Sequence, residues 1–459
     1  MGLFSFFLPK KEQKALNPNI LVNRPVQGVL TPLSVSYRQD NAYTSLSAVY
    51  TVVSYLMAKF ANVPIRVYKI EDKDAMKAYK RLQPHQFQRP SNYLKARKLQ
   101  RKALEQVDEN SDLSRLLQNP SPAFSSDGFL QTLYGFKLLK GEGFIWLNRG
   151  EGNEGNINKP VLEMLPVPPG LMLLVPDPED VYGIKEWVIQ LPQLRPLFKE
   201  DVILWKYPRF DFDSTTHIHL RGQSPLTAGY NDLEGIAAMD AAYKATFENR
   251  GANGVLMAED PDLTPEQISK IITTINERIN GAENSGTFAG GAGKYSFFDL
   301  SMSTRDMMLI EAKKFSVTQV AQLYNAPPGI WDLTESANNN ITQYRAQVYT
   351  DKIMGEWSSL LSQLNSQILP AFGIQGTHYI DADYSEIPDL QADMERMLTT
   401  VKDAWEITPN EKRELRGYEL STDPLMDTQW VPSGYKPLED AAINIDDLPP
   451  DPLTDKPIK

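Results

Sequence analysis

The sequence contains no cysteine and only four histidines in 459 residues. The absence of cysteine excludes disulfide scaffolds, thiolate metal sites and cysteine nucleophiles, and it is compatible with a reducing cytoplasm. A positive charge balance is also missing, because the formal net charge is −11 at pH 7. Nonspecific DNA affinity depends on many Lys and Arg contacts to phosphates, so this balance excludes a general nucleic-acid coat and leaves only local or weak contact with DNA.

The N-terminal segment "MGLFSFFLPKKEQK" has no apolar run long enough for a signal peptide or a membrane span. Its apolar part extends only from Leu3 to Leu8, and no basic segment precedes it. Phe6 stands where N-myristoylation requires Ser or Thr. We expect residues 1–39 to form a flexible arm with an apolar tip, and the acidic, proline-rich residues 436–459 to form a disordered tail.

The glycine-rich stretch "GTFAGGAGKYS", residues 286–296, superficially resembles a phosphate-binding loop. A GxxxxGK[ST] loop needs a first glycine where this chain has Phe288, and a hydroxyl side chain after the lysine where it has Tyr295. The pattern therefore predicts no nucleotide site. It indicates a glycine turn between two short strands.

Hydrophobic residues make up 41% of the chain, enough for several packed modules. Periodicity predicts a helix from Ser45 to Ala61 followed by the strand "VPIRVYKI", and further short strands make the first half a mixed α+β module. Two long helices are expected at 224–250 and 304–324, with a strand–helix–strand insert between them. A polar loop and a long helix from about Ile341 to Leu369 should follow.

Residues 71–115 are dense in lysine and arginine and are interrupted by Pro84 and Pro90. One interpretation is a solvated, partly helical insertion; the other is a surface for nucleic acid or an acidic partner. Near the other end, Thr408 and Glu411 have the spacing of a helix-capping box, with Pro409 at the first helical position.

One stretch, "DFDSTTHIHL", suggests an enzyme. Asp211, Asp213, His217 and His219 are metal-ligand types, and on a strand their alternation would place each pair on one face. A metal-dependent hydrolase or nuclease could use such residues. The alternative is a polar turn, because the segment lies in a loop before a long helix and no second cluster of acids or histidines supports it.

A colinear series of strings resembles the portal proteins of tailed bacteriophages, in the large family shared by many long-tailed phages. The series covers about residues 45–420 and consists of "SAVYTVVSYLMAKFANVPIRVYK", "LLQNPSP", "LLKGEGFIWLNR", "GQSPL", "NRGANGVL", "EAKKFSVTQVAQLYNAPP", "NITQYRAQVYTDKIMGEW" and "ITPNEKRELRG". The basic insertion is longer than this family leads us to expect, and "SANNN" is this chain's own version of a variable loop. A different ring or adaptor component of the virion fits less well, because such proteins are usually much shorter.

The resemblance implies an α+β portal fold without enzymatic activity or cofactor. It would comprise a mixed α/β wing, a two-helix stem, a small α/β clip, a long tunnel helix with its loop, and a helical crown. The corresponding ranges are 40–223 and 377–385 for the wing, 224–250 and 303–324 for the stem, 251–302 for the clip, 325–376 for the tunnel loop and helix, and 386–435 for the crown.

The resemblance also implies partners. The subunit would form a ring, usually of twelve copies, at a unique capsid vertex of a virion assembled in the bacterial cytoplasm. It would contact the large terminase subunit, the head–tail adaptor, the major capsid protein and a scaffold, and no membrane. Docking is expected at the clip residues Gly286, Gly290, Gly291, Gly293, Lys294 and Tyr295.

Double-stranded DNA would pass the tunnel loop, about residues 330–341. A channel lined by Lys or Arg would hold DNA back, since each phosphate contact adds affinity. Uncharged amides can instead make weak, exchangeable hydrogen bonds. The expected DNA-channel residues are Thr334, Glu335, Ser336, Asn338, Asn339, Asn340 and Thr342.

Overall fold

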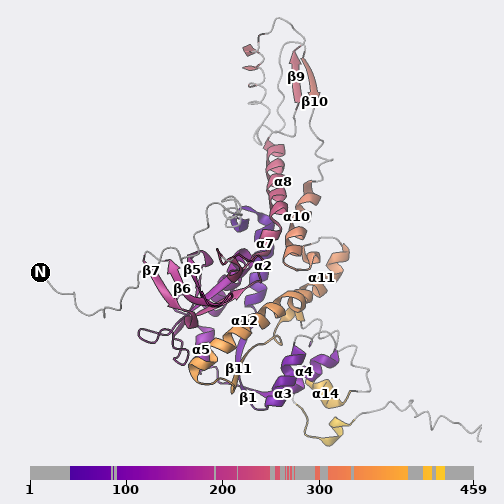
Figure 1. Ribbon diagram of the computed structural model, residues 1–459. Helices are drawn as coiled ribbons and strands as arrows, with labels where there is room; N and C mark the ends of the chain where they lie inside the picture. The colour runs from indigo at the N-terminus through magenta and orange to yellow at the C-terminus, as the bar shows by residue number, and fades with distance from the viewer. Residues whose placement is uncertain are drawn as a thin grey trace, which may run out of the picture. The chain divides into compact units, whose positions relative to one another are not determined.

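The computed structural model (Figure 1) describes two compact units of the chain. One unit is formed by residues up to Glu71 and from Leu104 to Leu390, and the other by Asp72–Ala103 together with the residues after Leu390. The described residues are 42–83, 86, 90–190, 193–213, 215–248, 254–258, 264, 266–267, 269–270, 273, 295–299, 309–331, 335–390, 407–415 and 420–428. The expected arm at 1–39 and tail at 436–459 lie outside them.

Three antiparallel sheets build the first part of the larger unit. In the first sheet, β1 (Ile65–Ile70) lies between β2 (Leu104–Gln106) and β11 (His378–Ala382), so a strand from late in the sequence completes an early sheet. The second sheet has the order β4 (Glu163–Val167), β3 (Glu142–Asn148) and β8 (Val202–Lys206). The third has the order β5 (Met172–Pro176), β6 (Ile184–Gln190) and β7 (Leu194–Phe198).

Helices α2 (Ser47–Ala61) and α6 (Ser126–Lys140) pack against each other beside these sheets. The short helix α5 (Asp112–Gln118) precedes α6. The Ser125 side chain caps the first turn of α6, and Gly141 ends the helix with φ 83°, a conformation that favours glycine. Cap and stop residues in the sequence therefore set both ends of this helix.

A stack of aromatic rings joins the helices to the second sheet. Phe60 of α2 lies 4.3 Å from Tyr134 of α6 and 4.4 Å from Trp357, between ring centroids. Trp205 of β8 lies 5.5 Å from Phe60. All four side chains are buried, so four distant parts of the chain share one core.

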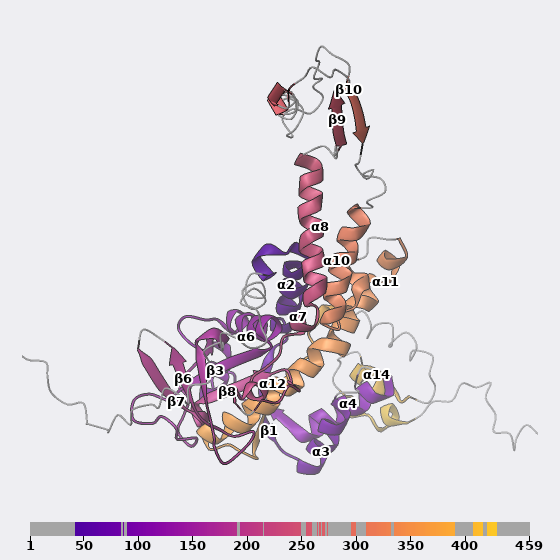
Figure 2. The same cartoon turned by 45° about the horizontal axis from the view of Figure 1, so that its top comes forward.

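Helices α7 (Pro225–Ala228), α8 (Tyr230–Glu248) and α10 (Leu309–Leu323) follow, and α8 and α10 lie side by side in Figures 1 and 2. The long helix expected at 224–250 is thus divided at Gly229. A Cβ atom at Gly229 would lie 2.2 Å from Cδ1 of Leu323, so glycine permits the close approach of α10. Beyond α8, β9 (Gly254–Ala258) pairs antiparallel with β10 (Tyr295–Asp299).

The sequence prediction of a loop up to residue 341 was wrong at its C-terminal end. Helix α11 begins at Glu335 and continues to Gln347, followed by the π-helix η7 (Val348–Ile353) and by α12 (Met354–Gln367). Neither glycine nor proline occurs between Glu335 and Met354, so nothing prevents the backbone groups from bonding along the helix. An asparagine in a helix lowers its stability by only about 0.5 kcal/mol relative to the better helix formers.

The smaller unit contains residues 72–103 of the basic segment. Helices α3 (Lys73–Leu82), α4 (Pro90–Ala103) and α14 (Pro409–Leu415) belong to it, and α4 contacts both of the others. The predicted capping box is present, since the Thr408 amide donates to Glu411 at 3.0 Å and the Glu411 amide to the Thr408 hydroxyl at 3.2 Å. Lys98 pairs with the same Glu411 at 2.6 Å, so part of the basic charge is neutralised within the unit.

Candidate functional site

The expected DNA-channel residues fall on or just before α11. Asn340 and Thr342 are exposed on this helix. The helix also includes Glu335, Ser336, Asn338 and Asn339. Thr334 lies outside the described residues. Gln343, which sequence reasoning did not select, is also exposed. The described outer surface of α11 is therefore mostly uncharged and rich in amide and hydroxyl groups, with Arg345 as an added positive charge.

Two aromatic contacts connect α11 and the residues just before it to the rest of the larger unit. Tyr344 lies against Gly329, where a Cβ atom would be 2.4 Å from Cε2 of the tyrosine ring. Trp331 meets Tyr55 of α2 edge to face, at 5.5 Å between ring centroids. The polar helix is consequently attached to the packed part of the larger unit through Tyr344 in its last turn and through Trp331 just before it.

One side of the helical segment that follows α11 is buried. Buried residues from Val348 to Ile368 form two rows in which positions repeat every four residues: Val348, Tyr349, Lys352, Ile353, Glu356, Trp357, Leu360, Leu361, Leu364 and Ile368. In an α-helix a four-residue step turns about 40° beyond a full circle, so such rows drift around the axis. The wider π-turn reduces this drift at the point where α11 leaves the core.

A buried polar cluster connects the helical segment to α6 and β8. Glu356 of α12 pairs with Lys137 of α6 at 2.5 Å and with Lys352 of η7 at 2.9 Å. The Tyr207 hydroxyl, just after β8, donates to Glu356 at 2.7 Å and accepts from Lys352 at 3.1 Å. Lys137 also lies over the Trp205 ring, 3.8 Å from its centroid.

Burial sets the direction of the pKa shift at Lys137 and Tyr207, whereas the neighbouring charges set it at Glu356. Burial lowers the pKa of Lys137 to about 8, although Glu356 opposes the shift. Burial alone would raise the pKa of Glu356, but Lys137 and Lys352 outweigh it and hold that pKa below its usual value. The pKa of Tyr207 is raised well above its usual value by burial. Sequence reasoning missed these residues; the available signal was a lysine, Lys137, between Phe136 and Leu138 in the apolar part of α6.

A second, partly buried ion pair forms the joint between the sheets and α7. Arg221 contacts Glu142 of β3 through Nε at 2.8 Å and also through Nη2. The Gly222 amide donates to the same carboxylate at 2.8 Å. A Cβ atom at Gly141 would lie 2.2 Å from the carbonyl carbon of Gln223, so the two backbones touch here. The strings "KGEGF" and "RGQSPL" are therefore structural partners, a pairing that sequence reasoning did not find.

The C-terminal end of α6 completes this joint. The Leu138 carbonyl accepts hydrogen bonds from the Ser224 hydroxyl at 2.8 Å and from the Tyr324 hydroxyl at 3.2 Å. Ser224 precedes α7, and Tyr324 follows α10. One carbonyl group thus ties both helical segments to the sheet-bearing part of the unit.

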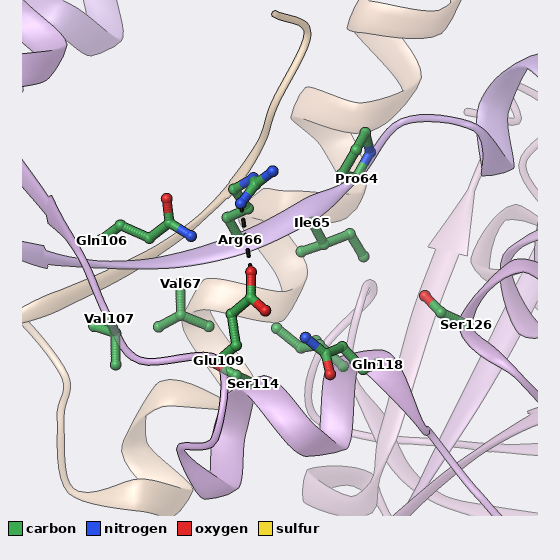
Figure 3. A pocket seen from close by; sticks show the side chains of 11 residues that line it. Pro64, Ile65, Arg66, Val67, Gln106, Val107, Glu109, Ser114, Gln118 and Ser126 are labelled. Carbon is green, nitrogen blue, oxygen red and sulfur yellow. Dashed lines mark ion pairs between the residues drawn. The ribbon is translucent and has the colours of Figure 1, made fainter. Parts of the chain in front are cut away.

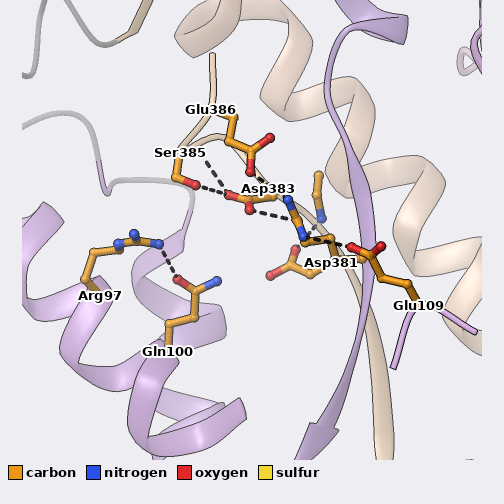
Figure 4. A network of polar contacts seen from close by, with 9 residues as sticks. Arg97, Gln100, Glu109, Asp381, Asp383, Ser385 and Glu386 are labelled. Carbon is orange, nitrogen blue, oxygen red and sulfur yellow. Dashed lines mark hydrogen bonds and ion pairs between the residues drawn. The ribbon is translucent and has the colours of Figure 1, made fainter. Parts of the chain in front are cut away.

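A surface pocket of about 230 Å³ lies beside β1 (Figure 3). Arg66 supplies the positive charge of its lining, but it pairs with three carboxylates, those of Glu109, Asp383 and Glu386, which Figure 4 shows. Arg66 contacts Glu386 at 2.7 Å, Asp383 at 3.1 Å and Glu109 at 3.7 Å. Because the guanidinium is already neutralised, the pocket offers little to a phosphate, and the contacts act as a clamp between β1 and the chain after β11.

The four candidate metal ligands do not converge on one point, although the His217 and His219 rings lie 5.9 Å apart between centroids. Asp211 pairs with Arg209 at 3.4 Å, and Asp213 accepts from the Thr216 hydroxyl at 2.7 Å. His219 is buried with Nε2 2.7 Å from the Val181 carbonyl. His217 precedes a short 3-10 helix and does not lie on a strand. Within the described ranges, no three His, Asp or Glu side chains are placed to share a metal ion.

Of the expected docking residues, only Tyr295 lies within the described chain. It is the first residue of β10 and pairs with Ala258 of β9. Gly286, Gly290, Gly291, Gly293 and Lys294 lie outside the described residues. In the part of the chain that the structure describes, no helix is both long and apolar enough to span a bilayer.

Comparisons with known proteins point to one family. The profile described as "Phage portal protein" matches residues 88–417. A solved structure described as the neck of a native GTA particle computed with C12 symmetry is 17% identical with a TM-score of 0.56, covering 86% of this chain and 96% of the other. The neck of an empty GTA particle computed with C6 symmetry is 18% identical with a TM-score of 0.58, covering 87% and 96%. No curated protein matches the chain.

Proposed function

The chain belongs to the phage portal protein family, and we propose that it forms a ring at one capsid vertex through which double-stranded DNA is packaged and ejected. The family match carries this proposal, and the α+β fold shared with the GTA neck structures supports it. Portal proteins are structural components of the capsid. The chemistry of ATP hydrolysis would belong to a terminase motor docked on the ring.

The proposed ring has twelve subunits in head-to-tail contact, an arrangement in which a fixed rotation closes the assembly. The C12 symmetry used for the neck of the native GTA particle supports this number. Assembly would take place in the bacterial cytoplasm, followed by incorporation at a unique vertex with the major capsid protein and a scaffold. The segment 251–302, with its expected docking residues, would meet the terminase first and the head–tail adaptor later.

The DNA would pass α11 and the residues just before it. Exposed amide and hydroxyl groups at Asn340, Thr342 and Gln343 offer weak, exchangeable hydrogen bonds to phosphate oxygens. Few charges on this surface would keep salt-dependent affinity low, so the duplex could move without being gripped. The clamp of Tyr344 on Gly329 and of Trp331 on Tyr55 would hold the helix in place while DNA moves past it.

The mass of the purified chain in solution tests the ring. Native mass spectrometry should give an assembly of about a dozen 51.8 kDa chains, with no stoichiometric metal in elemental analysis of the same sample. A monomer or dimer loaded with metal would contradict the proposal and favour a hydrolase.

Replacement of Asn338, Asn339 and Asn340 by alanine tests the channel. Ring assembly should be unchanged, while the length or retention of packaged DNA should change. The matched control replaces Ser358 and Ser362, which are exposed on α12, by alanine. Equal packaging by both variants would contradict a role for α11 in contacting DNA.

A further inference from the structure

An exposed aromatic surface lies where two loops of the larger unit meet. One loop is the turn between β5 and β6, residues 177–183, and the other follows β8, residues 207–217. Both pack on His219: the Val181 carbonyl is 2.7 Å from its Nε2, and the Tyr182 and Phe212 rings lie 5.7 and 4.6 Å from its ring. The His219 ring therefore forms the floor on which the two loops come together.

The two loops carry apolar side chains that are open to solvent. Phe210 is 89% exposed, Tyr182 74%, Phe212 62% and Val181 54%. Single exposed apolar residues are ordinary, but a contiguous group of this kind indicates a contact surface. Nδ1 of His219 is buried and has no hydrogen-bond partner among the described residues, so the histidine supports the two loops from below and is not itself a contact for a partner.

The same two loops are acidic. Residues 177–183 carry three carboxylates and no Lys or Arg, and residues 207–217 carry two carboxylates and Arg209, which gives a net charge of −4 with neutral histidine. We call the two loops with Val181, Tyr182, Phe210 and Phe212 the aromatic–acidic patch. Its partner should combine apolar side chains with positive charge.

The chain itself contains such a segment. Residues 3–8, LFSFFL, carry five apolar side chains, and residues 10–14 carry three lysines and one glutamate. We propose that this N-terminal arm docks on the aromatic–acidic patch, with its phenylalanines against the exposed aromatic rings and its lysines beside the loop carboxylates. The proposal does not depend on the DNA-conduit function.

The arm has the reach that docking requires. Residues 15–41 separate it from Ala42, the first described residue, and at about 3.3 Å per residue this spacer spans up to about 90 Å. A tethered segment meets its site at an effective concentration in the millimolar range, of order 1 mM, so even a weak apolar and ionic contact would be populated. Docking on the same chain or on a neighbouring copy uses the same chemistry.

Photo-crosslinking of the full-length protein tests the proposal. With p-benzoylphenylalanine in place of Phe6, the crosslinked peptides should come from residues 177–183 or 207–217. Phe212→Ser should reduce this yield several-fold, whereas Leu425→Ser, at a residue 60% exposed in the smaller unit, should not. The proposal would be overturned if the protein with the crosslinker at residue 6 kept the melting temperature of the wild type but gave no crosslinks, or gave crosslinks only to other parts of the chain.

A charge reversal separates docking from a structural effect on the loops. Glu179→Lys should lower the crosslink yield, Asp127→Lys on α6 should not, and Lys10→Glu with Lys11→Glu, which changes the charge of residues 10–14 from +2 to −2, should lower the yield in the otherwise unchanged protein. Equal yields in all four proteins would overturn the ionic part of the proposal. Placement of the photo-crosslinker at Tyr182 gives a further check, because crosslinks from patch to patch would show that a second copy covers this surface instead of the arm.

Discussion

Lys137 of α6 and Glu356 of α12 form an ion pair at 2.5 Å with both side chains almost fully shielded from water. Lys352 of the π-helix reaches the same carboxylate at 2.9 Å. The cluster therefore holds the helical segment that bears α11 against the aromatic core. One carboxylate thus neutralises two buried ammonium groups, so the stability of this region depends on Glu356.

Glu356→Ala should destabilise the fold strongly. It leaves Lys137 and Lys352 buried without a counter-charge, and loss of one partner of a buried pair typically costs about 3–5 kcal/mol. Chemical denaturation of the two proteins side by side measures the change. Lys69→Ala is the matched control, because Lys69 contacts Glu71 and Glu105 at the surface and its loss should leave unfolding almost unchanged. Similar effects for both variants would contradict a special role for the buried cluster.

Stability should depend on pH through Lys137. Its pKa is about 8 in the folded protein and near 10.5 when unfolded. Above pH 8 the unfolded state binds more protons at this site, so its contribution to the free energy of unfolding rises with pH, by at most about 1.4 kcal/mol per unit. Between pH 8 and about 9.5 the wild type should gain stability relative to Lys137→Met. Parallel pH profiles of the two proteins would contradict the shifted pKa.

Gly141→Ala should disrupt the joint before α7. The substitution forces a left-handed φ of 83° on alanine and places a methyl group 2.2 Å from the Gln223 backbone. Gly373→Ala separates the two effects, because Gly373 has φ 67° but open space around its Cβ position. The control should lose only about 1–2 kcal/mol from the backbone conformation. Melting temperatures should therefore fall further for Gly141→Ala; equal losses would show that the close approach of the two backbones is unimportant.

Added charge on α11 should slow DNA movement. In the double variant Thr342→Lys with Gln343→Lys, the ring should bind duplex DNA with an affinity that falls steeply with salt. The logarithm of the affinity should fall against the logarithm of the salt concentration with a slope of about 0.9 for each additional phosphate that the lysines neutralise. Ser358→Lys with Ser362→Lys adds the same charge to exposed positions of α12. Filter binding at two salt concentrations compares the variants, and identical salt dependence would place α11 away from the DNA path.

Local patterns in the sequence were sufficient for many elements and for the family. Ser125 and Gly141 mark the ends of α6, Thr408 and Glu411 form their capping box, and the colinear strings indicated the portal family that the profile match shows. These features depend on neighbours within a few residues or on order along the chain. A single sequence contains that information directly.

The tertiary structure decided the contacts between distant segments. The stretch before Ile341 had the pattern of a polar loop, yet it is helical from Glu335, and its anchor comes from Gly329 and the distant Tyr55. The sequence likewise showed His219 only as a possible ligand, whereas packing placed it under exposed rings with its Nε2 at a carbonyl. Lys137 and Glu356 are separated by 219 positions along the chain. Such pairs depend on how helices and strands pack, a long-range outcome that periodicity and caps do not encode.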